Sequence, residues 1–452
     1  MIKRIVIFSI LLMPFLTMAQ PEPKDNSPYS RYGIGDISDR NFYSSQFMGG
    51  LGASLNDQYQ INIVNPASLG GLTATTFDIG LYAEYSGLKD NSVQNFDYNW
   101  NGNLSYMSLA IPLQNRVNDL LERKVRNTTY AMAFTLMPYS TVGYNIATLD
   151  QTDPNIGDFS RIFRGSGGTY QFLYSAGIRH KKFSGGFNVG YLFGKIENER
   201  AVLFNQLEEP YFSFANETTS LTGFVWTGGL MYTHTLNKKA LDDKKTLEVK
   251  RITFGVHGNS NTSFNTTTDA FSGSERRLQS TFAQRDTLEG FPKTIEGSGT
   301  LPAQLGIGAT YYKGANFALG VNYETNSWSQ FASDIVNNNL KDTYKLSFGG
   351  FYRPNYKSIS SYLSRIYYRF GVHYQTVPSE EIAANAGKTV KDYGINIGFG
   401  LPFFYQRKIS HANLGLSAGL RGPGTAVEEQ YWKISFSFSF NDDEWFIKRK
   451  YN

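Results

Sequence analysis

The stretch that decides the fold class runs from residue 392 to 401 and reads Asp-Tyr-Gly-Ile-Asn-Ile-Gly-Phe-Gly-Leu. Large apolar residues alternate with small or polar ones at a period of two, which is the pattern of a β-strand with one apolar and one polar face. Near the C-terminus, Trp432, Ile434 and three phenylalanines alternate with Lys433 and three serines in the same way. A soluble β-sandwich also alternates. The aromatic apolar faces and the Gly, Ser, Asn and Thr faces opposite them instead favour a barrel in lipid.

The composition of the 452-residue chain excludes several classes of protein. Its length would ordinarily suggest two to four domains. The absence of cysteine excludes a disulfide framework, a thiolate metal site and a cysteine nucleophile. The formal net charge is +5, which falls to +3 when Lys3 and Arg4 are removed with a leader. A charge this small does not indicate a nucleic-acid partner, and we expect none.

The first nineteen residues are predicted to be a signal peptide. Lys3 and Arg4 precede a mostly apolar run from Ile5 to Leu16, and small residues before Gln20 mark a cleavage site. A membrane anchor is the alternative, but the run is shorter than the ~20 residues a spanning helix needs. We therefore expect an exported protein, and the alternating strand pattern then predicts a location in the outer membrane of a Gram-negative bacterium.

Period-two alternation continues from residue 76 to 440, which predicts an all-β, closed antiparallel transmembrane barrel of about fourteen strands. Only helices and closed barrels satisfy every backbone group in a bilayer. Short connections alternate with long ones, so the short ones are assigned to the periplasm. The expected strands are 76–87, 103–113, 129–148, 168–180, 184–197, 221–235, 250–264, 299–312, 316–327, 342–353, 364–376, 391–404, 411–421 and 430–440. The charged inner connections 114–128 and 236–249 are expected to form short helical turns.

Residues 20–75 do not alternate and contain two motifs, Met48-Gly49-Gly50-Leu51-Gly52-Ala53 and Asn65-Pro66-Ala67-Ser68-Leu69. Dense glycines permit close backbone approach and left-handed turns. Pro66 restrains Asn65 to an extended conformation. The segment is too apolar for a free linker, which predicts that it folds back into the barrel as a hatch.

These two motifs resemble the N-terminal hatch of the FadL/OmpP1/TodX family of outer-membrane transporters for hydrophobic compounds. The resemblance implies a fourteen-stranded barrel with Met48, Gly49, Gly50, Gly52, Asn65, Pro66 and Ala67 in the plug. Ser27–Asp36 and the ending Trp445–Tyr451 look like a Bacteroidetes-type member. Bacteria of this kind also use such barrels in secretion and barrel-assembly machines.

The predicted function is an outer-membrane channel for passive uptake of hydrophobic, fatty-acid-like small molecules. The alternative is a non-transporting barrel that acts as a scaffold in an outer-membrane secretion or assembly complex. The expected partners are outer-membrane lipid and lipopolysaccharide, a hydrophobic ligand, and other outer-membrane or periplasmic proteins if the alternative holds. We expect no enzyme activity, cofactor or metal.

Pro138, near the middle of the third strand, is the predicted site of a lateral gap in the wall. Proline cannot donate to a strand ladder, and the resembled family has a kink in this strand beside the hatch. An ordinary β-bulge is the alternative. We expect Asn65–Ala67 to pack beside the break.

Inward-facing glycines and bulky apolar residues are expected to shape the lumen. The glycines either leave room for the hatch and a solute or simply relieve barrel curvature; they are Gly80, Gly190, Gly394, Gly398 and Gly400. The bulky residues would give apolar patches of lining; they are Tyr82, Leu192, Met231, Phe351 and Tyr367.

The remaining candidate features carry weaker signals. Residues 441–452 are expected to form a periplasmic tail, either returning to the barrel base or solvated. Gly415–Gly419 fits a hydrolase pattern, but Ser417 falls inside a strand rather than on the strand-to-helix turn that a nucleophile requires. No pair of the five histidines has metal-ligand spacing. Arg276 and Arg277 could meet lipopolysaccharide or simply be solvated.

Overall fold

The computed structural model describes residues 27–442, except 92–94, 115, 125, 151–157, 205–210, 243–247, 279–281, 289, 335–339, 379–388 and 406–407. The predicted signal peptide and most of the predicted tail lie outside the described residues. The strands, in chain order, are β1 (Asp36–Ile37), β2 (Thr75–Asp90), β3 (Asn95–Pro112), β4 (Thr128–Asp150), β5 (Phe159–His180), β6 (Phe183–Phe204), β7 (Tyr211–Thr235), β8 (Lys250–Asn259), β9 (Thr262–Leu278), β10 (Phe282–Thr287), β11 (Lys293–Leu301), β12 (Gln304–Lys313), β13 (Phe317–Asn326), β14 (Ala332–Ser333), β15 (Thr343–Tyr352), β16 (Tyr367–Val377), β17 (Val390–Tyr405), β18 (Lys408–Arg421) and β19 (Val427–Asp442).

The helical elements are short. They are η2 (Pro28–Arg31), α2 (Tyr43–Gln46), η3 (Pro66–Gly71), α3 (Arg116–Leu121), α4 (Lys238–Asp242), η4 (Trp328–Gln330) and η5 (Leu363–Arg365). Both α3 and α4 fall in the charged inner connections where helical turns were predicted. No helix in the described part of the chain is long and apolar enough to cross a membrane.

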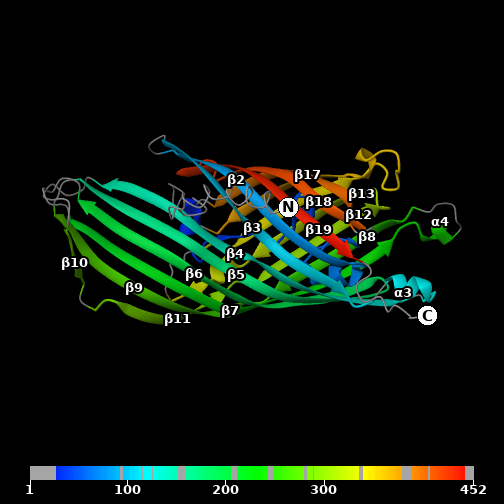
Figure 1. The fold of residues 1–452 in the computed structure, drawn as a ribbon, viewed down its shortest axis with the longest axis horizontal. Helices are drawn as coiled ribbons and strands as arrows, with labels where there is room; N and C mark the ends of the chain where they lie inside the picture. Colours follow the sequence, from blue (N-terminus) through cyan, green and yellow to red (C-terminus); the bar gives the residue numbers. More distant parts are fainter. Residues whose placement is uncertain are drawn as a thin grey trace, which may run out of the picture.

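The described strands close into one antiparallel barrel of fourteen strands, as predicted. The last strand pairs with the first, with Phe436 opposite Leu81. Two barrel strands are each built from two successive elements, because β7 pairs with β8 in one half and with β9 in the other, and β11 continues into β12. The β4–β7 side extends well beyond the rest of the barrel in Figure 1.

Alternation along the strands separates a lipid-facing surface from the lumen. In β17 the side chains of Tyr393, Ile395, Ile397 and Phe399 are exposed on the outside, whereas Gly394, Asn396 and Gly398 are buried inside. The hydrophobic sequence pattern therefore predicted the orientation of this strand correctly.

Outward aromatic side chains gather in two bands, as expected of a barrel in a bilayer. In one band Tyr344, Tyr374 and Tyr393 contact in series, and Tyr85 and Trp100 continue it on β2 and β3 with ring centroids 5.0 Å apart. The other band contains the pairs Phe183–Tyr232, Tyr311–Phe317, Tyr368–Phe399 and Phe403–Phe438. We call the end nearer the second band, which bears α3 and α4, the inner end, and the opposite end the outer end.

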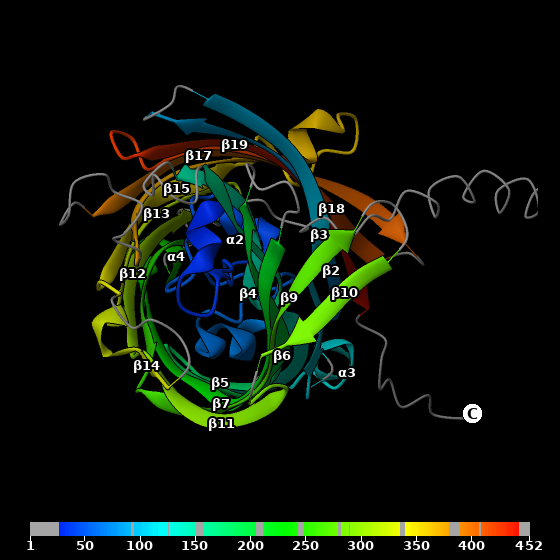
Figure 2. The ribbon, with the colours of Figure 1, turned by 90° about the vertical axis from the view of Figure 1, so that its left-hand side faces the viewer.

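The N-terminal segment fills the barrel instead of trailing from it. In Figure 2, which looks into the barrel, the blue segment with α2 lies within the ring of strands. Its side chains form the core with the wall: Ile34, Phe42, Phe47, Ile61, Ile63 and Leu69 are buried against wall residues such as Tyr106, Leu173, Leu192 and Phe264. The apolar core of this protein therefore lies between the segment and the inner surface of the barrel. We refer to residues 27–74 as the hatch.

Candidate functional site

The glycine motif of the hatch packs directly on the wall. Met48 is buried with Leu51, Phe351 and Tyr367. Gly49 and Gly50 have φ angles of +77° and +88°, a left-handed conformation that favours glycine. The wall also has a glycine at the contact: a Cβ at Gly371 would lie 2.0 Å from the Gly49 nitrogen. The two backbones can approach this closely only without side chains.

The Asn-Pro-Ala motif docks on the opposite part of the wall. Asn65 is fully buried, and its Nδ2 donates to the carbonyl oxygens of Ala53, Leu230 and Val256 at 2.6, 3.3 and 3.2 Å. Its Oδ1 accepts from the Ala67 amide at 3.2 Å and thereby caps η3. The side chain ties the two hatch motifs to each other and to β7 and β8.

Wall glycines make room for this motif. A Cβ at any of them would meet hatch backbone or the Asn65 side chain at 2.5 Å or less; they are Gly177, Gly186, Gly229 and Gly255. None of the four was singled out from the sequence. Of the five that were, Gly398 would bring a Cβ to 2.3 Å from the Phe47 ring, and Gly80 would bring one to 2.6 Å from Tyr106 of the wall and 2.9 Å from Tyr43 of the hatch. The other three meet neighbouring wall residues, which fits the curvature interpretation at those positions.

Pro138 lies at a break in β4. The register with β5 shifts between Pro138 and Ser140, which leaves Tyr139 bulged. Pairing with β3 covers only Met107–Pro112, opposite Ala131–Leu136, so the outer parts of the two strands are not paired with each other. Figure 1 shows the β2–β3 hairpin diverging from β4 toward the outer end. The segment that contacts β4 here is residues 27–38, whereas Asn65 contacts β7 and β8. The expectation that Asn65–Ala67 packs beside the break was therefore wrong: the hatch is long enough to place a different segment there.

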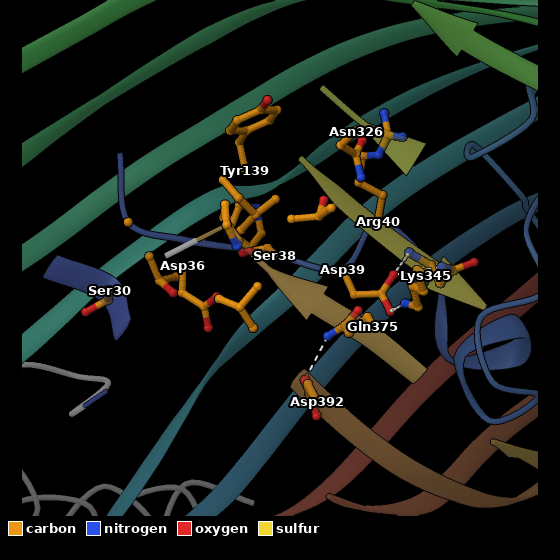
Figure 3. A pocket seen from close by; sticks show the side chains of 18 of the residues that line it. Ser30, Asp36, Ser38, Asp39, Arg40, Tyr139, Asn326, Lys345, Gln375 and Asp392 are labelled. Carbon is orange, nitrogen blue, oxygen red and sulfur yellow. Dashed lines mark hydrogen bonds and ion pairs between the residues drawn. The ribbon is translucent and has the colours of Figure 1, made fainter. Parts of the chain in front are cut away.

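A cavity of about 350 Å³ lies in the lumen between the hatch and the wall. Ser38, Asp39 and Arg40 of the hatch point into it, facing Tyr139 of β4 and Lys345, Gln375 and Asp392 of the wall (Figure 3). Its lining combines charged and polar side chains with apolar ones such as Leu104, Leu173 and Val225; the charged residues also include Asp36, Glu84, Arg421, Glu429 and Lys433.

Ion pairs join the hatch to the wall across this cavity. Asp39 Oδ2 lies 2.9 Å from Lys345 Nζ, and Asp36 Oδ2 lies 2.9 Å from Arg421 Nη1. Arg40 donates to Gln304 and, at 3.5 Å, to Thr227. Burial alone would raise the pKa of the Asp39 carboxyl, but the Lys345 ammonium and hydrogen bonds from Asn41 hold it below its usual range. Asp39 is thus an anion pinned to a wall cation at neutral pH.

Arg421 is the centre of the charged network. Beside Asp36, it lies 3.5 Å from Glu429 and 3.7 Å from Asp392. Asp392 also accepts hydrogen bonds from Gln375 and Tyr431 at 2.8 and 3.0 Å. Sequence reasoning missed this network. The available signal was the charged run Asp36-Ile-Ser-Asp39-Arg40, since charges in a segment predicted to enter a barrel need partners on the wall.

The structure also places the weaker candidates. Ser417 lies inside β18 and pairs with Asn396 and Lys433 of the neighbouring strands, so it does not sit on a nucleophile turn. Within the described ranges, no three His, Asp or Glu side chains come together in a way that could hold a metal ion. The side chains of Arg276 and Arg277 lie outside the described part of the structure.

Comparisons with known proteins give a family and a fold. The family model described as BamG matches residues 1–452. The fold is similar to that of the Ralstonia pickettii toluene transporter TbuX, with 14% identity over 91% of this chain and 99% of that chain and a TM-score of 0.53. It is also similar to the Pseudomonas putida toluene transporter TodX, with 15% identity over 91% of this chain and 99% of that chain and a TM-score of 0.50. The CymD monoaromatic hydrocarbon channel has 15% identity over 91% of this chain and 98% of that chain, with a TM-score of 0.50. At these identities the likeness concerns the fold alone, and it confirms the predicted resemblance to FadL-type barrels. No curated protein sequence matches the chain.

Proposed function

The chain belongs to the BamG family, and from this and the geometry of its lumen we propose that it is a barrel subunit of an outer-membrane protein-assembly complex. In this role the barrel presents surfaces to partner proteins and needs no solute path. The hatch then serves to close and stiffen the barrel.

One observation carries this proposal: most of the bulky apolar side chains expected to line the lumen are buried, and three of them pack in clusters with the hatch. Four of the five bulky residues that the sequence suggested as solute lining, Leu192, Met231, Phe351 and Tyr367, are 0%, 3%, 6% and 5% exposed. The fifth, Tyr82, is half-buried and borders the remaining cavity. The space that remains is bordered by Asp39, Lys345 and the Arg421 network together with apolar side chains such as Leu173 and Val225. A path for a hydrophobic solute needs apolar lining, and most of the bulky apolar side chains expected to provide it are buried instead.

The inner end offers a surface suited to protein partners. Its connections carry more described basic side chains (Arg123, Lys124, Arg126, Lys181, Lys182, Lys238, Lys239, Lys313, Arg353 and Lys357) than acidic ones (Asp119, Glu122, Asp242 and Glu248). Several lie on α4 and the tight β5–β6 turn. A basic rim favours encounter with an acidic periplasmic surface.

Depletion of the protein in its own bacterium tests the proposal. We expect other outer-membrane barrels to lose their heat-modifiable, folded form and to accumulate unfolded in the periplasm. Uptake of a labelled fatty acid should be measured in parallel before growth slows. Normal barrel assembly together with lost uptake would reject the assembly role and support transport.

Passive uptake of hydrophobic, fatty-acid-like molecules is the second candidate function, and the break in β4 favours it. The cavity reaches Leu104 and Ser105 of β3 and Pro138 and Tyr139 of β4, the two strands that separate toward the outer end. Solved barrels of similar fold include a toluene transporter and a monoaromatic hydrocarbon channel. A solute would enter from the outer surface and leave through the lateral opening between β3 and β4.

Pro138→Val tests the lateral route, because valine restores an amide donor and favours a regular strand. If solute passes there, uptake of a labelled fatty acid should fall while the barrel stays heat-modifiable. Pro402→Val is the matched control, since Pro402 lies in the regular β17–β18 ladder opposite His411. Equal uptake by the wild type and both variants would reject the lateral route.

A further inference from the structure

We propose that the outer part of β3 is a docking edge for an extended strand of a partner protein, which pairs with its main chain between Tyr98 and Leu104. This inference rests on the proposed role as a complex subunit and names one surface through which the subunit is held. The contact is β-strand addition at an open sheet edge.

The edge is open because the outer part of β3 is not paired with β4. β3 pairs with β2 along almost its whole length, from Asn95 opposite Asp90 to Ala110 opposite Thr76. It pairs with β4 only from Met107 to Pro112. The stretch from Tyr98 to Tyr106 is thus paired on one side only within the described residues, which is unusual in a barrel, whose closure normally removes every edge.

The facing edge of β4 is covered by the protein's own chain. β1 pairs Asp36 with Thr141 and Ile37 with Ser140. The Ser38 amide donates to the Tyr139 carbonyl at 3.0 Å, and the Ser27 amide donates to the Gly143 carbonyl at 2.8 Å. The hatch therefore already supplies a strand to one lip of the gap. No described segment does the same for the lip formed by β3.

Local side chains occupy some of the β3 edge and leave the rest. The Tyr98 amide donates to Asp97 Oδ1 at 2.9 Å, and the Leu104 amide donates to Asn103 Oδ1 at 2.8 Å. Alternate residues of a strand direct their backbone groups to the same side, so Trp100 and Gly102 present theirs between these two. The described structure gives them no backbone partner on that side. This short open stretch is the pairing site.

The side chains beside the edge suit a polypeptide with alternating apolar residues. Tyr98 and Trp100 are 61% and 67% exposed on the outer face of β3, and Tyr85 contacts both rings. An added strand would place every second side chain against this aromatic face. Acyl chains could cover the rings, but they carry no donors or acceptors for Trp100 and Gly102, and unpaired backbone groups are costly in hydrocarbon. An added strand would cover the aromatic rings with apolar side chains and also hydrogen-bond the backbone groups of Trp100 and Gly102.

Amide hydrogen exchange tests the proposal. In the purified barrel in detergent, the Trp100 and Gly102 amides, which are the open ones of the 98–104 segment, should exchange at least ten-fold faster than those of 107–111, which lie in the paired part of β3. In native outer membranes, where partners are present, both segments should be protected. In phospholipid–lipopolysaccharide vesicles holding the purified barrel alone, exchange of the Trp100 and Gly102 amides should stay fast. Protection in detergent or in these vesicles would overturn the proposal, as would fast exchange in native membranes.

Two variants at Trp100 test whether the backbone amide at the edge is needed for the protection. Trp100→Pro removes the amide donor from the edge and should abolish protection of the neighbouring amides in native membranes, whereas Trp100→Phe keeps the donor and an aromatic ring and should retain it. Protection of 107–111 reports that the hairpin still folds. If depletion impairs barrel assembly but the edge stays unprotected in native membranes, this inference fails and the proposed function stands. If the edge is protected but depletion leaves assembly normal, the partner belongs to another complex.

Discussion

Replacing Asn65 by leucine is expected to loosen the hatch while leaving the barrel closed. Leucine keeps roughly the same volume but removes the donor and the acceptor of a fully buried side chain. The Ala53 carbonyl loses a 2.6 Å hydrogen bond, and the Ala67 amide loses its 3.2 Å cap. The Leu230 and Val256 carbonyls lose weaker contacts at 3.3 and 3.2 Å.

The size of the effect follows from the two groups that lose their main partner. Leaving a buried donor or acceptor unsatisfied costs about 1–3 kcal/mol. Loss at Ala53 and Ala67 together therefore weakens docking by about 2–6 kcal/mol. The smaller value alone raises the undocked fraction roughly thirty-fold, since about 1.4 kcal/mol corresponds to a factor of ten. The barrel ladder is untouched, so its folding should not change.

A single introduced cysteine can report hatch release, because the chain contains none. Ser68→Cys lies in η3, where the native side chain is 4% exposed. A bulky thiol reagent should label this cysteine slowly in the otherwise native protein and much faster with Asn65→Leu, while heat-modifiability on gels shows that the barrel persists. Asn316→Leu is the matched control, because this amide makes an exposed hydrogen bond to Pro354 at the inner end. Equal labelling rates for Asn65→Leu and Asn316→Leu would refute the proposed docking role of Asn65.

Three further predictions use the same reporter or refolding into vesicles. Gly186→Ala should weaken docking of the hatch by about 1–3 kcal/mol, because the alanine Cβ would lie 2.5 Å from Pro66. Gly185→Ala is the control, because the nearest atom to its Cβ would be 3.5 Å away. Equal labelling of the two variants would contradict the close approach at Gly186. Ile397→Arg, midway along an exposed face, should destabilise refolding by about 2–4 kcal/mol, against about 0–1 kcal/mol for Gln430→Arg near the outer end; similar urea midpoints would argue against this placement in the bilayer. Because Lys345 lowers the Asp39 pKa, their pairing stabilises the docked hatch above about pH 4 and is lost as the pH falls. Asp39→Asn should therefore label faster at neutral pH with a flatter pH dependence, and a profile parallel to that of the wild type would exclude this carboxyl as the source.

The barrel could be predicted from sequence because the bilayer imposes a strong constraint on every strand. An outward residue must be apolar and its neighbours must not be, so the sequences of β17 and β19 show which side chains face the lipid. Strand ends were less predictable. β5, β6 and β7 run further toward the outer end than expected, since strands continuing beyond the lipid no longer need an apolar face.

The contacts between the hatch and the wall could not be predicted to the same degree. The positions of Asn65 and Gly49 followed from their motifs, but the glycines that receive them, such as Gly255 and Gly371, look like any other inward glycine in the sequence. Matching a hatch residue to its wall partner requires the register of the whole barrel. The pair Asp36–Arg421, which is separated by most of the chain, shows why local pattern was insufficient.

The charged residues in the lumen and the open β3 edge both depend on how the hatch packs in the barrel. The hatch uses the apolar wall for packing, and it places charged residues in the remaining space, where Lys345 and Arg421 balance them. By adding β1 to β4 it also completes one side of the gap that the bulge at Pro138 begins. A protein that only transported solute through this gap would benefit from an apolar approach on both lips. Here β4 is completed with main-chain hydrogen bonds, whereas Trp100 and Gly102 of β3 have no backbone partner on that side among the described residues. This difference between the two strands is the reason for proposing a polypeptide partner there rather than a small hydrophobic molecule.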